Sequence, residues 1–301
     1  MEGSKHNLDQ LILGTAQLGM PYGIANKTGR PNQKNATQII ETAWSSGIKT
    51  FDTAQGYGNS EEVLGRAFHD LSISGDLKVI SKLHPKLNHQ NRDELVRSLE
   101  NSLTLMGVSQ LYGLLLHSEE LLALWEGSLV EFAESAIKKR LVKKFGVSVY
   151  SPEAALQATE IPGIGIIQLP TNILDRRFVD AGVFELAKKK GIEVHIRSAF
   201  LQGLILLQVD EIPASLKKVT GALSHLDELC KGYSITRQQL ALTYLKQEFP
   251  EAKLVFGAET AKQVTGNIDC WQKKNIVIPP EAWKQLEGLD QEILNPSLWK
   301  L

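Results

Sequence analysis

Short apolar segments alternate with segments of helical spacing along the whole chain of 301 residues. The clearest helical pattern ends at Gly107, and others end at Gly47 and Gly191 just before an apolar segment begins. The apolar face of the clearest pattern consists of Leu95, Leu99, Leu103 and Met106. Helix, glycine and strand in repeated order are typical of α/β units, so this alternation predicts an α/β fold.

Eight of the apolar segments are candidate strands. They span residues 11–19, 49–54, 77–83, 111–118, 142–150, 164–172, 192–200 and 252–258. Eight strands with helices between them fit a (β/α)8 TIM barrel, for which about 250 residues is typical. A doubly wound sheet has the same alternation. No linker-like run of Pro, Gly and Ser divides the chain, so we expect a single domain over residues 1–301.

Chemistry-bearing residues stand at or just beyond the C-terminal ends of seven consecutive candidate strands. They are Asp52 and Tyr57, Lys82, His117, Ser148, Gln168 and Asn172, Arg197 and Ser198, and finally Gly257. In a TIM barrel the active site lies at this end of the strands. The gathering of these residues at one end therefore favours the barrel over the doubly wound sheet.

Asp52, Lys82 and Tyr57 form the most informative group. Asp52 and Lys82 would both point into the barrel mouth, where a buried charge needs a partner, and a structural salt bridge is one reading of that pair. A phenol with an ordinary pKa of about 10 donates protons poorly near neutrality, but an adjacent ammonium lowers that pKa. Tyr57 beside Lys82 would thus make a workable general acid. His117 is either a satisfied core histidine or a fourth member of this group.

The charge balance argues against large charged partners. The chain has 33 basic and 34 acidic residues, a net charge of −1, and so no electrostatic footprint for nucleic acid or a membrane surface. We expect a small ligand. Cys230 and Cys270 lie apart, and the chain has no metal-ligand motif, so no metal site is expected. No signal pattern opens the sequence and no apolar run approaches the roughly 20 residues of a membrane span, which predicts a cytoplasmic location.

Several short motifs resemble those of one family. FDTAQGYG, VISKL and LLLHS look like the Asp, Tyr, Lys and His motifs of the aldo-keto reductases, in the same order and spacing. Further similar stretches are LGTAQLG, GVS (146–148), IIQLPTNILDRR (166–177), FLQG (200–203) and VFGAETAKQVTGN (255–267). The resemblance implies a (β/α)8 barrel that binds NADP(H) or NAD(H) without a Rossmann motif. The chain indeed has no G-x-G-x-x-G.

The resemblance also implies roles for individual residues. Tyr57 would be the proton donor, Lys82 the cation that lowers its pKa, Asp52 the anchor of Lys82, and His117 the donor that orients the carbonyl. The residues expected to bind cofactor are Gly14, Thr15, Asp52, Ser148, Gln168, Asn172, Arg197, Ser198, Phe200, Gln202, Gly203, Gly257, Glu259, Gln263 and Asn267. Each of the binding residues has the plainer alternative of a polar group satisfied at a strand end.

Three departures from the family pattern bear on the cofactor. Val149 replaces an asparagine and cannot make the expected amide contact. Arg197 stands where an aromatic residue often stacks on the nicotinamide; its guanidinium can stack on an aromatic face, or it can meet an anionic substrate or phosphate. Glu259 and Gln263 stand where relatives carry cations for the 2′-phosphate of NADP, and only Lys262 remains nearby. This pattern predicts use of both nucleotides without a strong preference for NADP.

The function implied by the resemblance is reversible reduction of an aldehyde, ketone or sugar-like carbonyl. The loop at residues 20–32 is similar to that of a bacterial branch associated with surface-polysaccharide and nucleotide-sugar gene clusters, although an ordinary surface turn has the same composition. Two other functions stay open. One is a redox-neutral epimerase or eliminase with a retained cofactor, and the other is a silent cofactor-binding subunit, against which the intact acid residues argue. The substrate and the oligomeric state are beyond the sequence.

Overall fold

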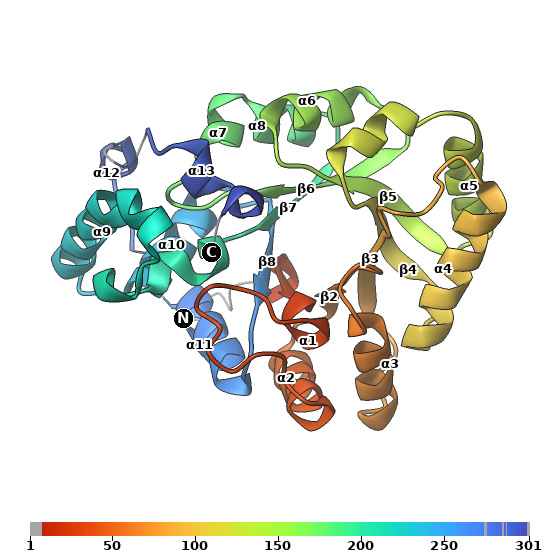
Figure 1. Cartoon of the computed structure of the whole chain (residues 1–301), viewed down its shortest axis with the longest axis horizontal. Helices are drawn as coiled ribbons and strands as arrows, with labels where there is room; N and C mark the ends of the chain where they lie inside the picture. The colour runs from red at the N-terminus through yellow and green to blue at the C-terminus, as the bar shows by residue number, and fades with distance from the viewer. Residues whose placement is uncertain (1–7, 274–275, 285, 287, 300–301) are drawn as a thin grey trace, which may run out of the picture.

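Eight parallel strands close into a barrel in the order β1 to β8 in the computed structural model, which describes residues 8–273, 276–284, 286 and 288–299 (Figure 1). The strands are β1 (Leu11–Gly14), β2 (Thr50–Asp52), β3 (Lys78–Leu83), β4 (Leu111–Leu116), β5 (Val142–Ser148), β6 (Ile164–Pro170), β7 (Glu193–Arg197) and β8 (Lys253–Gly257). Pairing of β1 with both β2 and β8 closes the sheet. The fold is the predicted TIM barrel.

Helices surround the barrel. The larger ones are α2 (Gln33–Ser46), α3 (Ser60–Asp70), α4 (Arg92–Met106), α5 (Gly127–Lys138), α6 (Pro152–Glu160), α8 (Val183–Lys189), α9 (Thr220–Tyr233), α10 (Arg237–Glu248) and α11 (Ala261–Gln272). Short α-helical turns are α1 (Ala16–Gly19), α7 (Arg177–Asp180), α12 (Glu281–Lys284) and α13 (Gln291–Leu294). The 3-10 segments are η1 (Leu8–Gln10), η2 (Glu119–Leu124), η3 (Leu201–Leu206), η4 (Val209–Glu211), η5 (Ala214–Val219) and η6 (Pro296–Leu298). No helix within the described residues is long and apolar enough to cross a membrane.

The ends of α4 follow from local sequence. The side chain of Asn91 accepts a hydrogen bond from the backbone N–H of Glu94 at 3.2 Å, which caps the first turn. Gly107 ends the helix with φ of 65°, a left-handed conformation that glycine adopts without steric cost. The predicted apolar face is buried as expected, at Leu95, Leu99, Leu103 and Met106. The glycine signal therefore located this helix correctly.

Two apolar layers hold the barrel together. Within β1, Leu11 and Leu13 belong to the large cluster that includes the helices, whereas Ile12 between them packs in a separate small cluster. That small cluster consists of Ile12, Ile80, Leu115, Ile166 and Val255. Because successive side chains of a strand point to opposite faces, the small cluster is the inner filling of the barrel and the large one is the layer between strands and helices.

Several strands end earlier than the sequence suggested. The candidate strand at 11–19 is wrong beyond Gly14, because the chain turns there into the helical turn α1. The backbone N–H of Leu18 donates to the carbonyl of Thr15 at 3.0 Å, which starts this turn. Likewise β7 ends at Arg197 and not at residue 200. At the C-terminal ends of β1 and β7, apolar residues continue beyond the last hydrogen bond between strands, so the sequence pattern overestimates the length of the strands.

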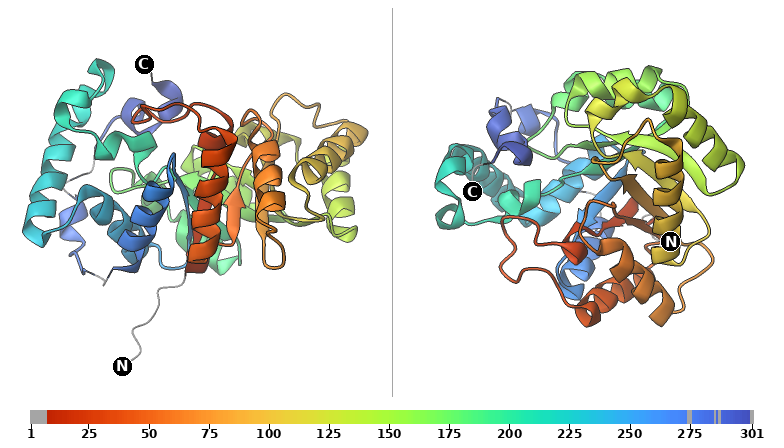
Figure 2. Two further views of the ribbon diagram at one scale, coloured as in Figure 1. Left: turned by 90° about the horizontal axis from the view of Figure 1, so that it is seen from below. Right: turned by 45° about the vertical axis from the view of Figure 1, so that its right-hand side comes forward.

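Loop 20–32 lies over the barrel end that carries the C-terminal ends of the strands, as Figure 2 shows. It meets the segment that follows β7, residues 198–206, which we call the β7 loop. The backbone N–H of Ile24 donates to the carbonyl of Gln202 in this loop at 3.1 Å, and just beyond the loop Glu211 of η4 pairs with the ammonium of Lys27. Two segments far apart in the sequence thus form one roof beside the barrel mouth.

Candidate active site

Asp52 and Lys82 form a buried ion pair at the barrel mouth. Their side chains are 4% and 1% exposed, and Lys82 Nζ lies 2.6 Å from Asp52 Oδ1. The ammonium also donates to the carbonyl of Thr53 at 2.8 Å, and Gln168 Nε2 donates to Asp52 Oδ2 at 2.8 Å. The predicted pairing of Asp52 with Lys82 is therefore present, and both carboxylate oxygens have partners.

Tyr57 stands over this pair. Lys82 Nζ lies 4.9 Å from the centroid of the phenol ring, and the imidazole of His117 meets the same ring edge-on, with centroids 5.4 Å apart. Four residues from the ends of β2, β3 and β4 thus converge, and we call them the acid cluster: Asp52, Tyr57, Lys82 and His117. A phenol, an ammonium and an imidazole in contact can protonate and orient a carbonyl oxygen.

The segment from β2 to Tyr57 is fixed by its main chain and by Gln55. Gln55 Oε1 accepts from the backbone N–H of His84 at 2.7 Å, and its Nε2 donates to Ser102 Oγ at 2.9 Å. Gly19 of α1 packs directly against this segment, because a Cβ there would lie 1.8 Å from the carbonyl oxygen of Tyr57. The phenol is thus held by two neighbouring segments, and the sequence reading assigned no role to Gln55.

The electrostatics of Tyr57 differ from the expectation. Burial raises the pKa of Tyr57, and the charge of Asp52 raises it further, while Arg197 is the cation that lowers it. Burial also lowers the pKa of Lys82, against the opposing effect of Asp52. The phenol pKa is thus raised overall, because Asp52, which pairs with the ammonium of Lys82, acts in the same direction as burial. The expected lowering of this pKa by Lys82 stays a prediction. Tyr57 keeps its proton at neutral pH.

His117 follows β4 and is neutral near pH 7. Burial, together with the positive charges of Lys82 and Arg197, lowers its pKa from 6.5 to about 3. Its Nδ1 is buried and has no hydrogen-bond partner among the described residues. A Cβ at Gly56 would come within 3.4 Å of this nitrogen, so a glycine makes room for the ring. A neutral imidazole can donate one N–H to a carbonyl oxygen.

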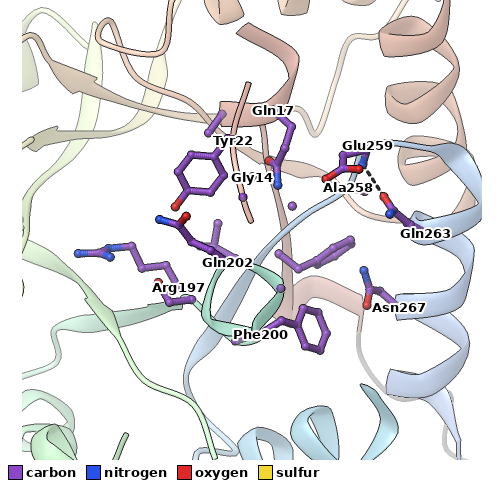
Figure 3. A pocket seen from close by; sticks show the side chains of 18 of the residues that line it. Gly14, Gln17, Tyr22, Arg197, Phe200, Gln202, Ala258, Glu259, Gln263 and Asn267 are labelled. Carbon is purple, nitrogen blue, oxygen red and sulfur yellow. Dashed lines mark hydrogen bonds between the residues drawn. The ribbon is translucent and has the colours of Figure 1, made fainter. Parts of the chain in front are cut away.

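A cavity opens beside Asp52 and Tyr57. It is lined by Gly14, Thr15, Ala16, Gln17, Tyr22, Gly23, Ala25, Asp52, Tyr57, Gln168, Arg197, Ser198, Ala199, Phe200, Gln202, Gly203, Leu206, Gln238, Val255, Phe256, Gly257, Ala258, Glu259, Gln263 and Asn267. Every residue that the sequence assigned to cofactor binding is in this lining except Ser148 and Asn172. Figure 3 shows Arg197 at one end of the cavity and Gln263 and Asn267 at the other.

Ser148 and Asn172 are buried near the cavity without lining it. Asn172 Nδ2 donates to the carbonyl of Ser198 at 3.2 Å, and its Oδ1 accepts from the backbone N–H of Leu174 at 2.9 Å. The amide of Asn172 therefore has internal partners on both sides. Its predicted contact with a cofactor stays a prediction, as does that of Ser148.

Thr15 and Gly14 shape the floor of the cavity. Thr15 Oγ1 donates to the carbonyl of Asp52 at 2.9 Å and lies 2.8 Å from Ser60 Oγ. The strand register places Gly14 opposite both Asp52 and Gly257. A Cβ at Gly14 would lie 3.1 Å from Val255 Cγ1, and one at Gly257 would lie 2.2 Å from the amide nitrogen of Gln17. A side chain at Gly14 would press on Val255, whereas one at Gly257 would displace the flexible end of Gln17.

The β7 loop contains several residues in the left-handed backbone conformation. Ser198, Leu201, Gln202 and Gly203 have φ values of 63°, 48°, 53° and 95°. The backbone N–H groups of Leu201 and Gly203 close turns within the loop by donating to the carbonyls of Ser198 and Phe200 at 2.8 Å and 2.9 Å. The loop lines the cavity, and its contact with a dinucleotide pyrophosphate stays a prediction.

The start of α11 forms the far end of the cavity. Gln263 closes a capping box with Thr260, and its Oε1 also accepts from the backbone N–H of Glu259 at 2.6 Å, as drawn in Figure 3. Asn267 is buried and accepts from Gln238 Nε2 at 2.8 Å, which leaves its own Nδ2 to face the cavity. Lys262 is exposed and is not part of the lining.

Tyr22, Gln17 and Gln238 were missed as site residues by sequence reasoning. Tyr22 reaches the cavity from loop 20–32, where burial and the nearby Tyr57 raise its pKa to about 12. The one available signal was an aromatic residue in a loop of Gly, Pro and Asn that is longer than a minimal turn. Separately, the described residues contain no group of three or more His, Cys, Asp or Glu side chains that could hold a metal ion.

Comparison with known proteins decides the family. The sequence profile of the Aldo/keto reductase family matches residues 10–291. This chain belongs to that family. It is therefore an NAD(P)H-dependent oxidoreductase, as the resemblance of the acid-cluster motifs implied.

Individual aldo-keto reductases are distant relatives. The aldo-keto reductase YhdN of Bacillus subtilis is 25% identical over 197 residues, which cover 61% of this chain but only 57% of that protein. The L-glyceraldehyde 3-phosphate reductase of Escherichia coli (strain K12) is 24% identical over an aligned length of 325, covering 96% of this chain and 91% of that one. An aldo-keto reductase from Klebsiella pneumoniae, solved in complex with NADPH, has a TM-score of 0.67 at 19% identity, covering 92% and 89%. The last likeness supports the fold alone.

Proposed function

We propose that the protein reduces a carbonyl group to an alcohol, or runs the reverse reaction, with Tyr57 as the proton donor. The observation that carries this proposal is the acid cluster itself, assembled within contact distance, with Asp52 and Tyr57 in the cavity lining. A structural salt bridge alone would need Asp52 and Lys82 and would not need a phenol and a neutral imidazole above it.

The cavity lining fits a nicotinamide dinucleotide. The β7 loop would hold the pyrophosphate, while Glu259, Gln263 and Asn267 would face the adenosine end. Gln168, which donates to Asp52, would lie at the nicotinamide end. When bound, the nicotinamide supplies the hydride. The chain supplies the position of the carbonyl and the proton.

The acid cluster divides the remaining work. His117, neutral and short of one partner, donates an N–H to the carbonyl oxygen and turns it toward Tyr57. Tyr57 retains its proton until the oxygen gains negative charge, because burial keeps its pKa high. The ammonium of Lys82 then stabilises the phenolate that remains, and Asp52 holds that ammonium in place.

Reductase activity is tested by following absorbance at 340 nm with NADH or NADPH and a panel of aldehydes, ketones and sugars. Net loss of absorbance on at least one carbonyl supports the proposal. Substrate conversion without any net change at 340 nm, with cofactor retained on the protein, would instead establish the redox-neutral alternative. The roof formed by loop 20–32 and the β7 loop favours slow cofactor release and keeps that alternative in view.

We extend the proposal to cofactor choice. Glu259 and Gln263 line the cavity where the adenosine ribose would lie, and a carboxylate there accepts a hydrogen bond from a ribose hydroxyl but repels a 2′-phosphate. Lys262 lies outside the lining and is exposed, so it can reach a phosphate only by moving. Dual use of NADH and NADPH without strong preference is proposed because a movement of Lys262 into the site would offset the repulsion between Glu259 and the 2′-phosphate.

The test of cofactor choice is a pair of titrations with NADH and NADPH on the wild type and on Glu259→Arg. The variant replaces a repelling charge by a partner for the phosphate and should shift the ratio of dissociation constants toward NADPH about tenfold. Lys262→Gln serves as the matched control for loss of the nearest other charge. A wild type that binds NADPH more than about tenfold tighter than NADH contradicts the proposal.

The sugar-like substrate class rests on loop 20–32 and its resemblance to the polysaccharide-cluster branch. The names of the relatives above do not carry that association, so the branch remains our proposal, as does the cytoplasmic location. Activity on nucleotide sugars in the same panel tests the branch. Activity confined to simple aldehydes would contradict it.

A further inference from the structure

Arg197 is held rigidly at the end of β7. Its Nη2 donates to the carbonyl of Val149 at 3.0 Å, and its Cζ lies 4.0 Å from the centroid of the Tyr150 ring. Tyr150 is itself anchored, because its backbone N–H donates to Glu119 Oε2 at 2.6 Å. One face and one edge of the guanidinium are thus occupied by protein groups.

The charge of Arg197 has no anionic partner in the described part of the chain. No carboxylate there lies within ion-pair distance of it. Asp52 and Glu119 are engaged elsewhere: the oxygens of Asp52 accept from Lys82 and Gln168, and those of Glu119 accept from Tyr150 and Ser151. A half-buried guanidinium that stacks on a ring but lacks a counter-ion is a ready partner for an incoming carboxylate or phosphate.

Arg197 lies at the catalytic end of the cavity. Its charge lowers the pKa of Tyr57, Tyr22 and His117, so it is electrostatically close to the phenol and imidazole. Figure 3 shows it at the opposite end of the lining from Gln263 and Asn267, where the adenosine would lie. An anion at Arg197 would therefore sit beside the carbonyl, and the 2′-phosphate would be remote.

We propose that Arg197 binds an anionic group of the substrate and thereby selects carbonyl compounds that carry a carboxylate or a phosphate close to the reacting carbon. The role of Arg197 in substrate selection rests on the proposed reductase function, whereas the anion-binding site itself does not. A short oxo acid or a phosphorylated hydroxyaldehyde has the required chemistry. An uncharged sugar or aldehyde lacks the group that Arg197 would bind.

The first test measures binding without turnover. Benzoate and benzamide have nearly the same shape and differ in charge, and isothermal titration calorimetry of each is run on the protein alone and saturated with NADP⁺. We expect the wild type to bind benzoate at least about tenfold tighter than benzamide, and Arg197→Met to lose this preference. Arg30→Met is the matched control. Arg30 is on loop 20–32, donates to Asn59 and lies outside the cavity lining, so this variant should keep the preference.

The second test measures selectivity in turnover. Succinic semialdehyde is compared with butanal, and glyceraldehyde 3-phosphate with glyceraldehyde, which separates carboxylate from phosphate. Arg197→Met should lower kcat/KM on the charged member of the preferred pair by about 30-fold or more and change the neutral member less than about threefold. Arg197→Lys keeps the charge without the fork and should recover part of the loss.

The outcomes separate the two proposals. A wild type that prefers benzoate but reduces no carbonyl retains the anion site and overturns the reductase function. A wild type that reduces carbonyls but binds benzamide as well as benzoate overturns the anion site and leaves the reductase function standing. Equal loss of kcat/KM on charged and neutral members, with weaker binding of NADPH in Arg197→Met, would make Arg197 a cofactor residue and also overturn the inference.

Discussion

The acid cluster and the dinucleotide end of the cavity are built in different ways. Asp52, Lys82 and His117 come from the ends of adjacent strands and meet through their side chains. The dinucleotide end depends on main-chain conformation, with left-handed residues in the β7 loop and a bond from Ile24 to Gln202. Substitutions in the acid cluster should therefore change catalysis and the balance of buried charge. Substitutions at the dinucleotide end should change cofactor affinity by straining the backbone.

Breaking the ion pair should have the largest effect. Lys82→Met leaves Asp52 buried without its cation, and removing one partner of a buried pair costs about 3–5 kcal/mol of unfolding free energy. The double variant Lys82→Met/Asp52→Asn removes both charges and should recover most of that stability without recovering activity. Urea unfolding monitored by circular dichroism, with a parallel activity assay, measures both. Equal stability of the single and double variants would show that the charge of Asp52 is solvated.

Removing the phenol hydroxyl should separate chemistry from binding. Tyr57→Phe keeps the ring contact with His117 but has no proton to donate, so kcat on the best carbonyl should fall about 100-fold or more. The dissociation constant for NADPH should change little. Retention of more than about a tenth of wild-type kcat would exclude Tyr57 as the proton donor. Tyr112→Phe is the control, because Tyr112 is on β4 and its hydroxyl donates to Glu193 outside the cavity lining.

The neutral state of His117 predicts a pH dependence of stability. Its pKa is about 3 in the fold, against 6.5 for the ordinary side chain, so between these values the unfolded chain binds more protons. The unfolding free energy should therefore fall as pH falls from 6.5, by at most about 1.4 kcal/mol per pH unit. Between pH 7 and pH 5 the wild type should lose about 2 kcal/mol more than His117→Gln.

Urea unfolding at the two pH values measures this difference. His69→Gln provides the comparison, because His69 is on the surface with its side chain 90% exposed. That variant should follow the wild type. An identical pH dependence for His117→Gln and the wild type would mean that the imidazole is solvated in the folded protein.

The smallest effect should come from the roof. Gly203 has φ of 95° and a Cβ there would lie 2.5 Å from Ala25 Cβ, whereas Gly29 has φ of 71° and open space around it. Alanine at either position pays for the left-handed backbone, about 1 kcal/mol. Only Gly203→Ala should also weaken NADPH binding, several-fold, because it pushes loop 20–32 away. Equal NADPH affinities in the two variants would show that the roof contributes nothing to cofactor binding.

The eight strands and the acid cluster could be predicted from the sequence because each depends on local pattern. Period and glycine placement locate a strand, and the end of a parallel strand locates its last side chain, as at Asp52 and Lys82. The ends of β1 and β7 could not be predicted, because turns begin there within apolar sequence. Gln238 on α10 and Tyr22 on loop 20–32 could not be predicted as cavity residues, because tertiary packing brings them there.

The charge state of the site was also beyond the sequence. A lysine beside a tyrosine suggests a depressed phenol pKa, but burial and the charge of Asp52 act in the opposite direction and raise it overall. Arg197, which stands on the opposite side of the barrel, is a second cation that lowers the phenol pKa, and its effect could not be predicted from the motif. The spacing of the motifs predicts which residues meet, but it does not predict their combined electrostatic effect on the phenol pKa.

Gly19 and Gly58 face each other main chain to main chain. A Cβ at Gly19 would lie 1.8 Å from the carbonyl oxygen of Tyr57, and one at Gly58 would lie 2.4 Å from the carbonyl oxygen of Gly19. A side chain at either glycine would collide with backbone atoms, so no second substitution of a neighbouring side chain could make room for it. Libraries that diversify the barrel mouth should leave both glycines fixed and vary loop 20–32 from Pro21 onward.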